Sequence, residues 1–539
     1  MKMKFKRLTG VIFLAMVFMF VAPASGVVHS KASVKAPKYI FFFLGDGMSA
    51  SQIQATEAFL ATQYALDKEW PIGPSAGQIY SEYLLNSSNR LNMSRMHVAG
   101  MQTTYDSFSL MTDSASSATA FACGIKTVSG TIGMDDTKTY SYKSVAQLAK
   151  EQGRKVGVLT SVSLDHATPA AYYASVASRS YMNSIATQLA ETGYEFFGGG
   201  GFVAPASANK TGDTANNIWD LLASKGYEIR NTKSSILALK DAPRDKVVCI
   251  NPTLDDSSAM PYAIDQPKEN LSLSEMTEVA IANLYTGWVE DWSWWGDDES
   301  SDNGFFIFVE GGKIDWACHA NDAMAAIGDM LDFDNAVGVA MNFYRNHPRE
   351  TLVLVTGDHE TGGMSIGHAT TAYKAYYERL FGQKMSYESF TANEWALHKA
   401  AYETATCPNV AAPDNLATNA EMVELLEEAF GIVWDELNDY QKEKLEDAYD
   451  KSLCGANDNS DAENKLLYGG YNPIVVTITH ILNEQASIGW TSYSHTGVPV
   501  PIFAHGVEDY RFSGFYDNTD IARKIARVMG ITKHLPIEK

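Results

Sequence analysis

Residues 38–48 read KYIFFFLGDGM, an unbroken apolar run that stops at Gly-Asp-Gly. A continuous rather than alternating apolar run is typical of a strand that is covered on both faces. Comparable runs recur at Val156–Val162, Lys246–Ile250, Phe305–Val309, Thr351–Val355 and Pro501–Ala504. The sequence therefore predicts that Tyr39–Leu44 is one of several buried strands in a largely parallel sheet.

Helical patterns separate most of these runs. They span Lys143–Gln152, Tyr181–Glu191, Ser272–Tyr285, Asp322–Arg345 and Asp520–Met529. Ser272 and Glu275 have the spacing of a capping box, which marks the start of one helix. Strands that alternate with helices predict an α/β fold, a three-layer sandwich with a central, mostly parallel sheet.

Residues 361–489 separate two predicted strands by far more than an ordinary connection. This segment contains amphipathic helical patterns of its own at Asn419–Phe430 and Glu436–Tyr449, so we expect an inserted subdomain. A smaller insertion is expected from Leu60 to about Met96. The acidic, Trp-rich run Trp288–Asp302 is expected to form a surface loop.

The composition excludes one class of partner. The 539-residue chain carries a formal net charge of -22 and is 45% hydrophobic, enough for a sizeable core. Nucleic acids are bound by clustered Lys and Arg, so this charge argues against a nucleic-acid partner. The same charge would repel anionic substrates at long range, and bound metal cations are the most direct way to reverse the local field.

The N-terminus has the pattern of a signal peptide over residues 1–26. A basic start that includes Lys2 and Arg7 precedes the apolar stretch Val11–Val21, and small residues follow. The apolar stretch is shorter than the roughly 20 residues that a membrane span needs. We therefore expect export to the periplasm or the extracellular space, with no stable membrane span.

The cysteines do not form a complete disulfide framework, because their number is odd. They are Cys123, Cys249, Cys318, Cys407 and Cys454. Cys407 and Cys454 alone share the segment that looks inserted, which makes them the favoured pair for a disulfide.

Metal-ligating side chains follow the ends of the predicted strands, where open parallel sheets place their ligands. These residues are Asp46, Thr168, Glu310, Asp315, His319, Asp358 and His359. Asp315 and His319 are four apart, so on a helix they share a face, and a carboxylate with an imidazole suits zinc. Each pair alone is a weak signal, because exposed Asp/His couples are common on helices that bind no metal. Taken together, the strand ends predict a metal site.

The run TDSASSATA at residues 112–120 is the sharpest chemical signal. Its small side chains would let a helix pack closely against the sheet, with the serines as caps. Alternatively, Ser114 at the helix start would lie over free backbone N–H groups, a natural place for phosphate, and a nearby zinc would activate its hydroxyl as a nucleophile. The metal-rich strand ends favour the nucleophile.

These motifs, in this order, resemble those of the alkaline phosphatase family. The segments that carry the resemblance are Gly45–Gly47, Asp113–Gly124, His166–Pro169, Arg179, Val309–Gly312, Asp315–His319, Gly357–Thr361 and His495–Gly497. The resemblance implies one catalytic domain over residues 37–539. The 361–489 insertion resembles that of marine bacterial members and lies where animal members carry a crown domain.

The resemblance also implies the site. Zinc one would be held by Asp315, His319 and His495, zinc two by Asp46, Asp358 and His359, and magnesium by Asp46, Thr168 and Glu310. Ser114 would form a phosphoserine during hydrolysis of small phosphate monoesters, and Arg179 would clamp two phosphate oxygens. The family further implies a homodimer.

Three further residues are expected beside these groups: Asp113, His166 and Trp316. The last two, His166 and Trp316, characterise the subtype. One bacterial branch of the family has Asp at the position of His166 and Lys at the position of Trp316. We expect His166 to soften the magnesium site and Trp316 to weaken the binding of product phosphate. Cys318 is offset on the helix from Asp315 and His319 and is expected to pack in the core.

Two other functions are compatible with parts of this pattern. Phosphodiesterases and sulfatases of the same superfamily usually place Thr or a modified Cys at the nucleophile, whereas this chain has Ser114. A catalytically silent exported binding protein would be expected to lack the nucleophile or a ligand, yet every matching position is filled.

Overall fold

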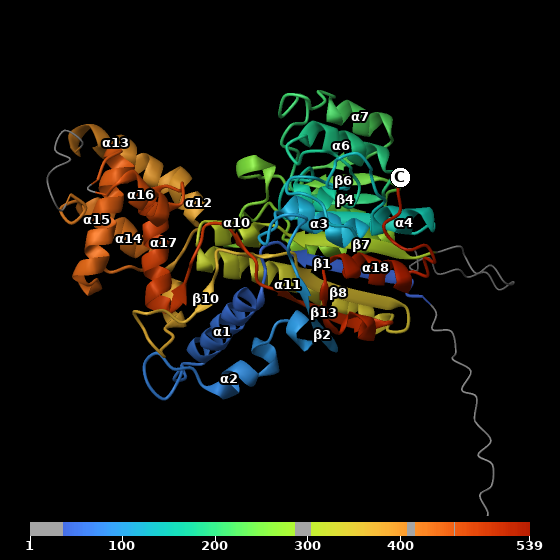
Figure 1. The fold of residues 1–539 in the computed structure, drawn as a ribbon. Coiled ribbons are helices and arrows are strands. Elements are labelled where there is room, and N and C mark those ends of the chain that lie inside the picture. The colour runs from blue at the N-terminus through green and yellow to red at the C-terminus, as the bar shows by residue number, and fades with distance from the viewer. Residues whose placement is uncertain (1–35, 286–302, 407–414, 458) are drawn as a thin grey trace, which may run out of the picture. The chain divides into compact units, whose positions relative to one another are not determined.

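The computed structural model describes residues 36–285, 303–406, 415–457 and 459–539 (Figure 1). The predicted signal peptide, the Trp-rich run and Cys407 lie outside these residues. Cys454 is disulfide-bonded, and Cys123, Cys249 and Cys318 are free. Within the described part of the chain, no helix has both the length and the apolar character of a membrane span.

A ten-stranded sheet forms the centre of the protein, in the order β14-β2-β13-β8-β1-β7-β3-β4-β6-β5. In chain order these strands are β1 Tyr39–Gly45, β2 Val98–Thr103, β3 Lys155–Thr160, β4 Phe196–Gly199, β5 Glu228–Arg230, β6 Val247–Ile250, β7 Phe305–Gly311, β8 Thr351–Gly357, β13 Val500–Gly506 and β14 Gly514–Asp517. All neighbours pair in parallel except β13, which is antiparallel to β2 and β8. The predicted mostly parallel sheet is confirmed, with one reversed strand.

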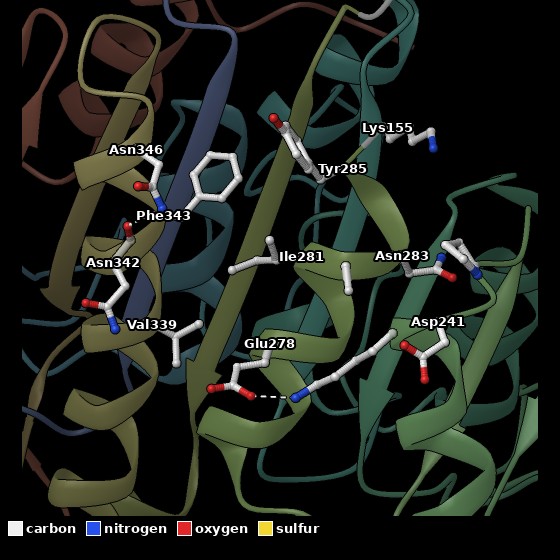
Figure 2. Close-up of a pocket in the computed structure, with 13 residues that line it drawn as sticks. Lys155, Asp241, Glu278, Ile281, Asn283, Tyr285, Val339, Asn342, Phe343 and Asn346 are labelled. Atoms are coloured by element: carbon white, nitrogen blue, oxygen red, sulfur yellow. Dashed lines mark hydrogen bonds and ion pairs between the residues drawn. The ribbon is translucent and has the colours of Figure 1, made fainter. Parts of the chain in front are cut away.

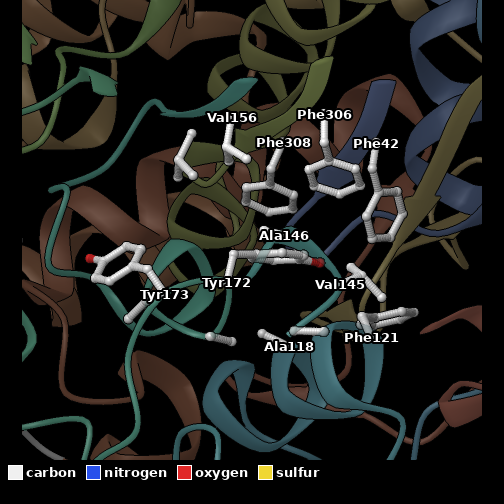
Figure 3. Close-up of a cluster of buried hydrophobic side chains, with 14 of the residues drawn as sticks. Phe42, Ala118, Phe121, Val145, Ala146, Val156, Tyr172, Tyr173, Phe306 and Phe308 are labelled. Carbon is white, nitrogen blue, oxygen red and sulfur yellow. The ribbon is translucent and has the colours of Figure 1, made fainter. Parts of the chain in front are cut away.

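The central strand β1 is buried on both faces, which explains why apolar and polar residues do not alternate in its sequence. Phe41 and Phe43 enter one buried cluster, whereas Ile40, Phe42 and Leu44 enter another on the opposite face. Successive side chains of a strand point to opposite faces, so an apolar run without gaps supplies both clusters. Figure 3 shows Phe42 in the second of these clusters, together with aromatic side chains of β7 and of the helix that carries Phe121.

Helices cover both faces of the sheet, as Figure 1 shows. One cluster includes side chains from α3 Ser114–Cys123, α4 Val145–Glu151, α5 Ala167–Ala170, α6 Met182–Glu191, α7 Ile218–Ser224 and α18 Thr519–Val528. The other includes side chains from α1 Ala50–Asp67, α8 Lys233–Leu237, α9 Leu273–Leu284, α10 Lys313–His319 and α11 Ala323–Asn346. The five predicted helices are confirmed to within two residues at each end, and the Ser272–Glu275 capping box is present. The expected small insertion from Leu60 begins inside α1, which the sequence analysis missed.

The segment 361–489 forms helices whose apolar sides meet in a third buried cluster. They include α12 Tyr387–Phe390, α13 Ala396–Thr406, α14 Ala420–Phe430, α15 Asp439–Cys454, α16 Asp461–Tyr468 and α17 Pro473–Ala486. The two ends of the segment lie together, because β10 Ser365–Ile366 pairs with β11 Ile488–Gly489. The cluster also takes in Phe59 of α1 and Ile327 of α11, so these helices pack on the sandwich.

Candidate active site

Carboxylates converge at the carboxyl edge of the sheet, where β1, β7 and β8 end side by side. Gly45, the last residue of β1, lies opposite Gly357, the last residue of β8. The next residues are Asp46 and Asp358, and β7 contributes Glu310 one residue before its end. All three carboxylates have no exposed surface. Parallel pairing in register therefore creates a dense negative cluster.

The first ligand group combines Asp315 and His319 of α10 with His495 of β12 His495–Thr496. The two histidine Nε2 atoms are 3.1 Å apart, and they lie 3.3 and 3.5 Å from the carboxylate oxygens of Asp315. His319 Nδ1 donates to the backbone oxygen of Tyr493 (2.6 Å), and His495 Nδ1 donates to that of Thr112 (2.7 Å). These bonds direct both Nε2 atoms inward, as expected for a zinc-type ligand set.

The second group lies beside Ser114. His359 Nε2 is 3.3 Å from Asp46 Oδ1 and 3.3 Å from Asp358 Oδ2. Ser117 Oγ donates to Asp358 Oδ2 (2.9 Å), and Ser114 Oγ is 3.5 Å from His359 Nε2. The Ser114 hydroxyl thus lies beside two carboxylates and an imidazole whose ligand atoms are all within 4.8 Å of one another.

The third group uses the other side of Asp46. Thr168 Oγ1 donates to Asp46 Oδ2 (3.3 Å), and His166 Nδ1 lies 3.9 Å from Glu310 Oε1. His166 Nε2 is 3.1 Å from Nη2 of Arg179, which can only donate, so Nε2 accepts and Nδ1 carries the ring proton. A ring nitrogen of His166 lies within 4.8 Å of carboxylate oxygens of Asp46 and Glu310, but a protonated Nδ1 is a poor ligand. The oxygens of Asp46, Thr168 and Glu310 therefore suit a hard cation better.

The electrostatics of this edge fit bound cations. Burial, followed by repulsion from neighbouring carboxylates, chiefly Asp358, raises the pKa of Asp46 well above its usual range. Asp46 Oδ1 and Glu310 Oε1 are buried without a hydrogen-bond partner among the described residues. Buried carboxylate oxygens normally have partners, and divalent cations would supply both the missing contacts and the missing positive charge.

Ser114 begins α3, and its position is set by the residue before it. Asp113 is the N-cap and accepts from the backbone N–H of Ser116 at 3.0 Å. Every residue of α3 is buried, and Ala115, Ala118 and Ala122 are small enough to bring the helix backbone close to the sheet. The two alternatives for residues 112–120 are therefore compatible. The helix packs closely against the sheet, and its first residue, Ser114, faces the ligand cluster.

Arg179 is held in place by two groups. Its Nη1 is 3.1 Å from Asp113 Oδ2, and its Nη2 bonds to His166. Burial opposes ionisation of Asp113, but Arg179 and the bonds from Ser116 outweigh it, so the pKa of Asp113 lies below its ordinary value. The guanidinium is thus oriented beside Ser114 by the same carboxylate that caps α3.

Trp316 lies on α10 directly after Asp315. Its ring centroid is 6.1 Å from that of His166, and the Lys313 ammonium lies 4.9 Å from it. The Lys313 side chain has no exposed surface, and its Nζ is 3.0 Å from Glu388 Oε2 of the segment 361–489. The lysine next to the Trp316 ring is therefore Lys313, and its positive charge is paired with the carboxylate of Glu388.

The structure brings every sequence-predicted site residue to this edge. They are Asp46, Asp113, Ser114, His166, Thr168, Arg179, Glu310, Asp315, Trp316, His319, Asp358, His359 and His495. Two residues that orient the ligands, Thr361 and Thr160, were not predicted from the sequence. Thr361 donates to Asp315 and lies 3.2 Å from His359 Nδ1, and Thr160 donates to Glu310. The adjacency of Thr361 to the Asp358-His359 pair was the one available signal. Cys318 is buried and free, as expected.

A cavity of about 750 Å³ lies apart from this site (Figure 2). It lies between α9 and α11 near the amino ends of the strands, where Lys155 begins β3. The labelled side chains show Ile281, Val339 and Phe343 facing it, with the Lys240–Glu278 ion pair at its side. No nucleophile or clustered ligand set is among its lining residues.

Comparisons with known proteins agree on one family. The alkaline phosphatase family model matches residues 37–531. Alkaline phosphatase 3 of Bacillus subtilis (strain 168) is 30% identical over 520 residues, which cover 94% of this chain and 92% of that protein. A cold-active alkaline phosphatase from the psychrophile Shewanella sp. has a crystal structure that is 26% identical, with a TM-score of 0.63, over 91% of this chain and 99% of that one.

The Thermus thermophilus alkaline phosphatase structure shares the fold, with a TM-score of 0.66 at 22% identity, over 96% of this chain and 97% of that one. The family match spans the sheet, the ligand groups and the helix of Ser114. The chain therefore belongs to the alkaline phosphatase family of phosphomonoester hydrolases.

Proposed function

We propose that this enzyme hydrolyses small phosphate monoesters through a phosphoserine at Ser114, with two zinc ions and one magnesium ion in its site. The observation that carries the proposal is the placement of the Ser114 hydroxyl 3.5 Å from His359, within the group formed with Asp46 and Asp358. A serine at a helix start beside a buried ligand cluster and a tethered arginine suits phosphoryl transfer.

Each ligand group suits one cation. Asp315, His319 and His495 would hold one zinc, Asp46, Asp358 and His359 the second, and Asp46, Thr168 and Glu310 the magnesium. When bound, these ions supply charge neutralisation and lower the pKa of coordinated hydroxyl groups and water.

The protein groups then have distinct roles. Ser114 Oγ attacks phosphorus, so that a Ser–O–P bond forms while the bond to the ester oxygen breaks. Arg179 donates two N–H groups to the phosphoryl oxygens, a geometry that its contact with Asp113 preserves. Ser114 loses its hydroxyl proton to solvent, and the leaving oxygen takes up a proton and departs as the alcohol on the far side, toward Asp315 and His319. Water then attacks phosphorus from that side, so that the Ser–O–P bond breaks, inorganic phosphate is released and Ser114 is reprotonated.

The wider setting follows from the family resemblance. We propose a single catalytic domain over residues 37–539, with residues 361–489 as an inserted subdomain. We further propose export after removal of residues 1–26, and a homodimer.

Metal analysis combined with hydrolysis across pH tests the proposed function. Purified enzyme should contain zinc and magnesium, hydrolyse 4-nitrophenyl phosphate best above neutral pH, and lose activity on exhaustive chelation. Both ions together should restore it. A higher rate on bis(4-nitrophenyl) phosphate or on 4-nitrophenyl sulfate would favour a phosphodiesterase or a sulfatase instead. Activity that survives exhaustive chelation would contradict the proposal.

Asp113 has two roles, orienting Arg179 and capping α3, and two substitutions separate them. Asp113→Asn keeps an oxygen at the N-cap but removes the charge that orients Arg179, so KM should rise roughly three- to tenfold with stability almost unchanged. Asp113→Ala should add a loss of about 1 kcal/mol in the free energy of unfolding, measured by urea denaturation. Equal stability of the two variants would contradict the capping role.

Trp316→Lys should tighten the binding of product phosphate. An ammonium one residue from Asp315 would face the phosphate site, and Glu388 is already occupied by Lys313. The inhibition constant of inorganic phosphate should fall several-fold, measured by competitive inhibition, whereas Trp316→Phe should leave it nearly unchanged. Unchanged inhibition in Trp316→Lys would contradict this role.

A further inference from the structure

A second cavity, of about 310 Å³, lies against the same helix that carries the first ligand group. Trp316 and Ala320 of α10 form one wall. Most of the other lining residues come from the segment 361–489, with Tyr387 at the start of α12, Tyr471 just before α17 and Val475 in the first turn of α17. The cavity is therefore shared between the sandwich and the segment 361–489.

The cavity adjoins the ligand group through helix geometry. Trp316 and Ala320 directly follow Asp315 and His319, and each pair is spaced by four residues, so the two pairs form neighbouring faces of α10. A second connection runs through aromatic residues. The ring of Tyr471 lies 5.9 Å from that of Tyr493, whose backbone oxygen accepts the bond from His319.

The direction of phosphoryl transfer points toward this cavity. In an in-line displacement the nucleophile and the leaving oxygen lie on opposite sides of phosphorus. Ser114 lies with Asp46 and His359, so the leaving oxygen faces the side of Asp315 and His319. The organic part of the ester, which is attached to that oxygen, extends beside α10.

We infer that this cavity binds the organic part of the substrate and selects monoesters of uncharged aromatic alcohols, an inference that rests on the proposed function. Three aromatic side chains line it, Trp316, Tyr387 and Tyr471, and two valines of α17 complete an apolar surface. Its volume holds one aromatic ring with a short substituent. Stacked or edge-on contacts with such a ring would add binding energy that a methyl ester cannot gain.

The acidic residues of the cavity define what it excludes. Asp256 is exposed at its rim, and Glu388 is the partner of buried Lys313. No basic residue is among the lining residues. A leaving group with its own carboxylate or second phosphate would find no basic lining residue to pair with and would be repelled by Asp256 at the rim, so the cavity disfavours anionic alcohols.

Direct binding of two phosphonates to the metal-loaded enzyme tests the inference. Phenylphosphonate and methylphosphonate share the phosphate-like head and differ in the group that would enter the cavity. By calorimetry, the wild type should bind phenylphosphonate about tenfold more tightly than methylphosphonate. Adding a 4-carboxylate to the phenyl ring should remove most of this preference, and Asp256→Asn should restore part of it.

Two variants change the cavity in opposite ways. Tyr471→Ala removes an aromatic wall, and Ala392→Trp, at an exposed position of the lining, fills the cavity from its rim. Both should reduce the phenyl preference to threefold or less, by the same area argument, with methylphosphonate affinity nearly unchanged. Tyr440→Ala, an exposed tyrosine elsewhere in the segment, should leave the preference intact and serves as the control.

The outcomes separate the two hypotheses. Equal binding of the two phosphonates by the wild type, or a preference unaffected by both cavity variants, would overturn the inference while monoester hydrolysis still supported the proposed function. An absence of monoester hydrolysis in the metal-loaded wild type would instead refute the proposed function. A phenyl preference lost in both variants and kept in Tyr440→Ala would establish the subsite.

Discussion

Ser114→Ala is expected to lower kcat/KM for 4-nitrophenyl phosphate by roughly 10³-fold or more, because it removes the atom that forms the covalent bond. Alanine suits a helix start behind an unchanged Asp113 cap, so the fold should persist. Steady-state kinetics measure the loss, and thermal unfolding checks the fold. Acid quench of the wild type during turnover should yield a phosphorylated peptide that contains Ser114.

Ser117→Ala is the matched control for this substitution. Ser117 lies one turn along α3 and donates to Asp358, so its loss perturbs a ligand without removing the nucleophile. Its effect on kcat/KM should be roughly tenfold or less, and the phosphopeptide should still form. Equal losses in the two serine variants, or a Ser114→Ala enzyme with unchanged activity, would contradict the nucleophile assignment.

Asp46→Asn is expected to have the second-largest effect, because Asp46 belongs to two ligand groups at once. The substitution keeps the shape of the side chain but removes its charge. We expect a loss of roughly 10³-fold in kcat/KM together with a lower content of both zinc and magnesium, measured by elemental analysis. High metal concentrations should restore activity only in part.

Asp322→Asn provides a comparison with a buried aspartate outside the ligand groups. Asp322 caps α11 and accepts bonds from Gln383 at 2.8 and 2.9 Å. Its substitution should lower stability by about 1–2 kcal/mol with metal content unchanged. Normal metal content in Asp46→Asn would contradict the bridging role of Asp46.

The local sequence was sufficient for the elements that build the frame. The apolar run of β1 predicted burial on both faces, because consecutive apolar residues place apolar side chains on both sides of the strand. Direction was not predictable for β13, since an apolar run looks the same in a parallel and an antiparallel strand. The strands β2, β4, β5 and β14 were missed because their sequences are short or contain glycine and polar residues, so that they carry too few apolar residues to stand out.

The ligand types were likewise readable from the strand ends, since carboxylates and imidazoles at those positions converge once the strands are parallel. The side chains that hydrogen-bond to these ligands could not be predicted from the sequence. Thr361 and Ser117 orient ligands across 46 and 241 residues of sequence, and no local pattern signals such contacts. The pairing of Arg179 with His166, which argues against the histidine as a ligand, also required the folded arrangement.

The sequence by itself thus determined six of the ten strands of the sheet, several of the flanking helices and the chemical nature of the ligands, because apolar runs, helical spacing and residue type are local properties. Only the tertiary structure showed which of these ligand atoms lie close enough together to share a cation, and which side chains orient them. It also revealed that the inserted segment lines a cavity beside Trp316. These features depend on distances between segments far apart in the chain, and such distances are set by packing of the whole fold.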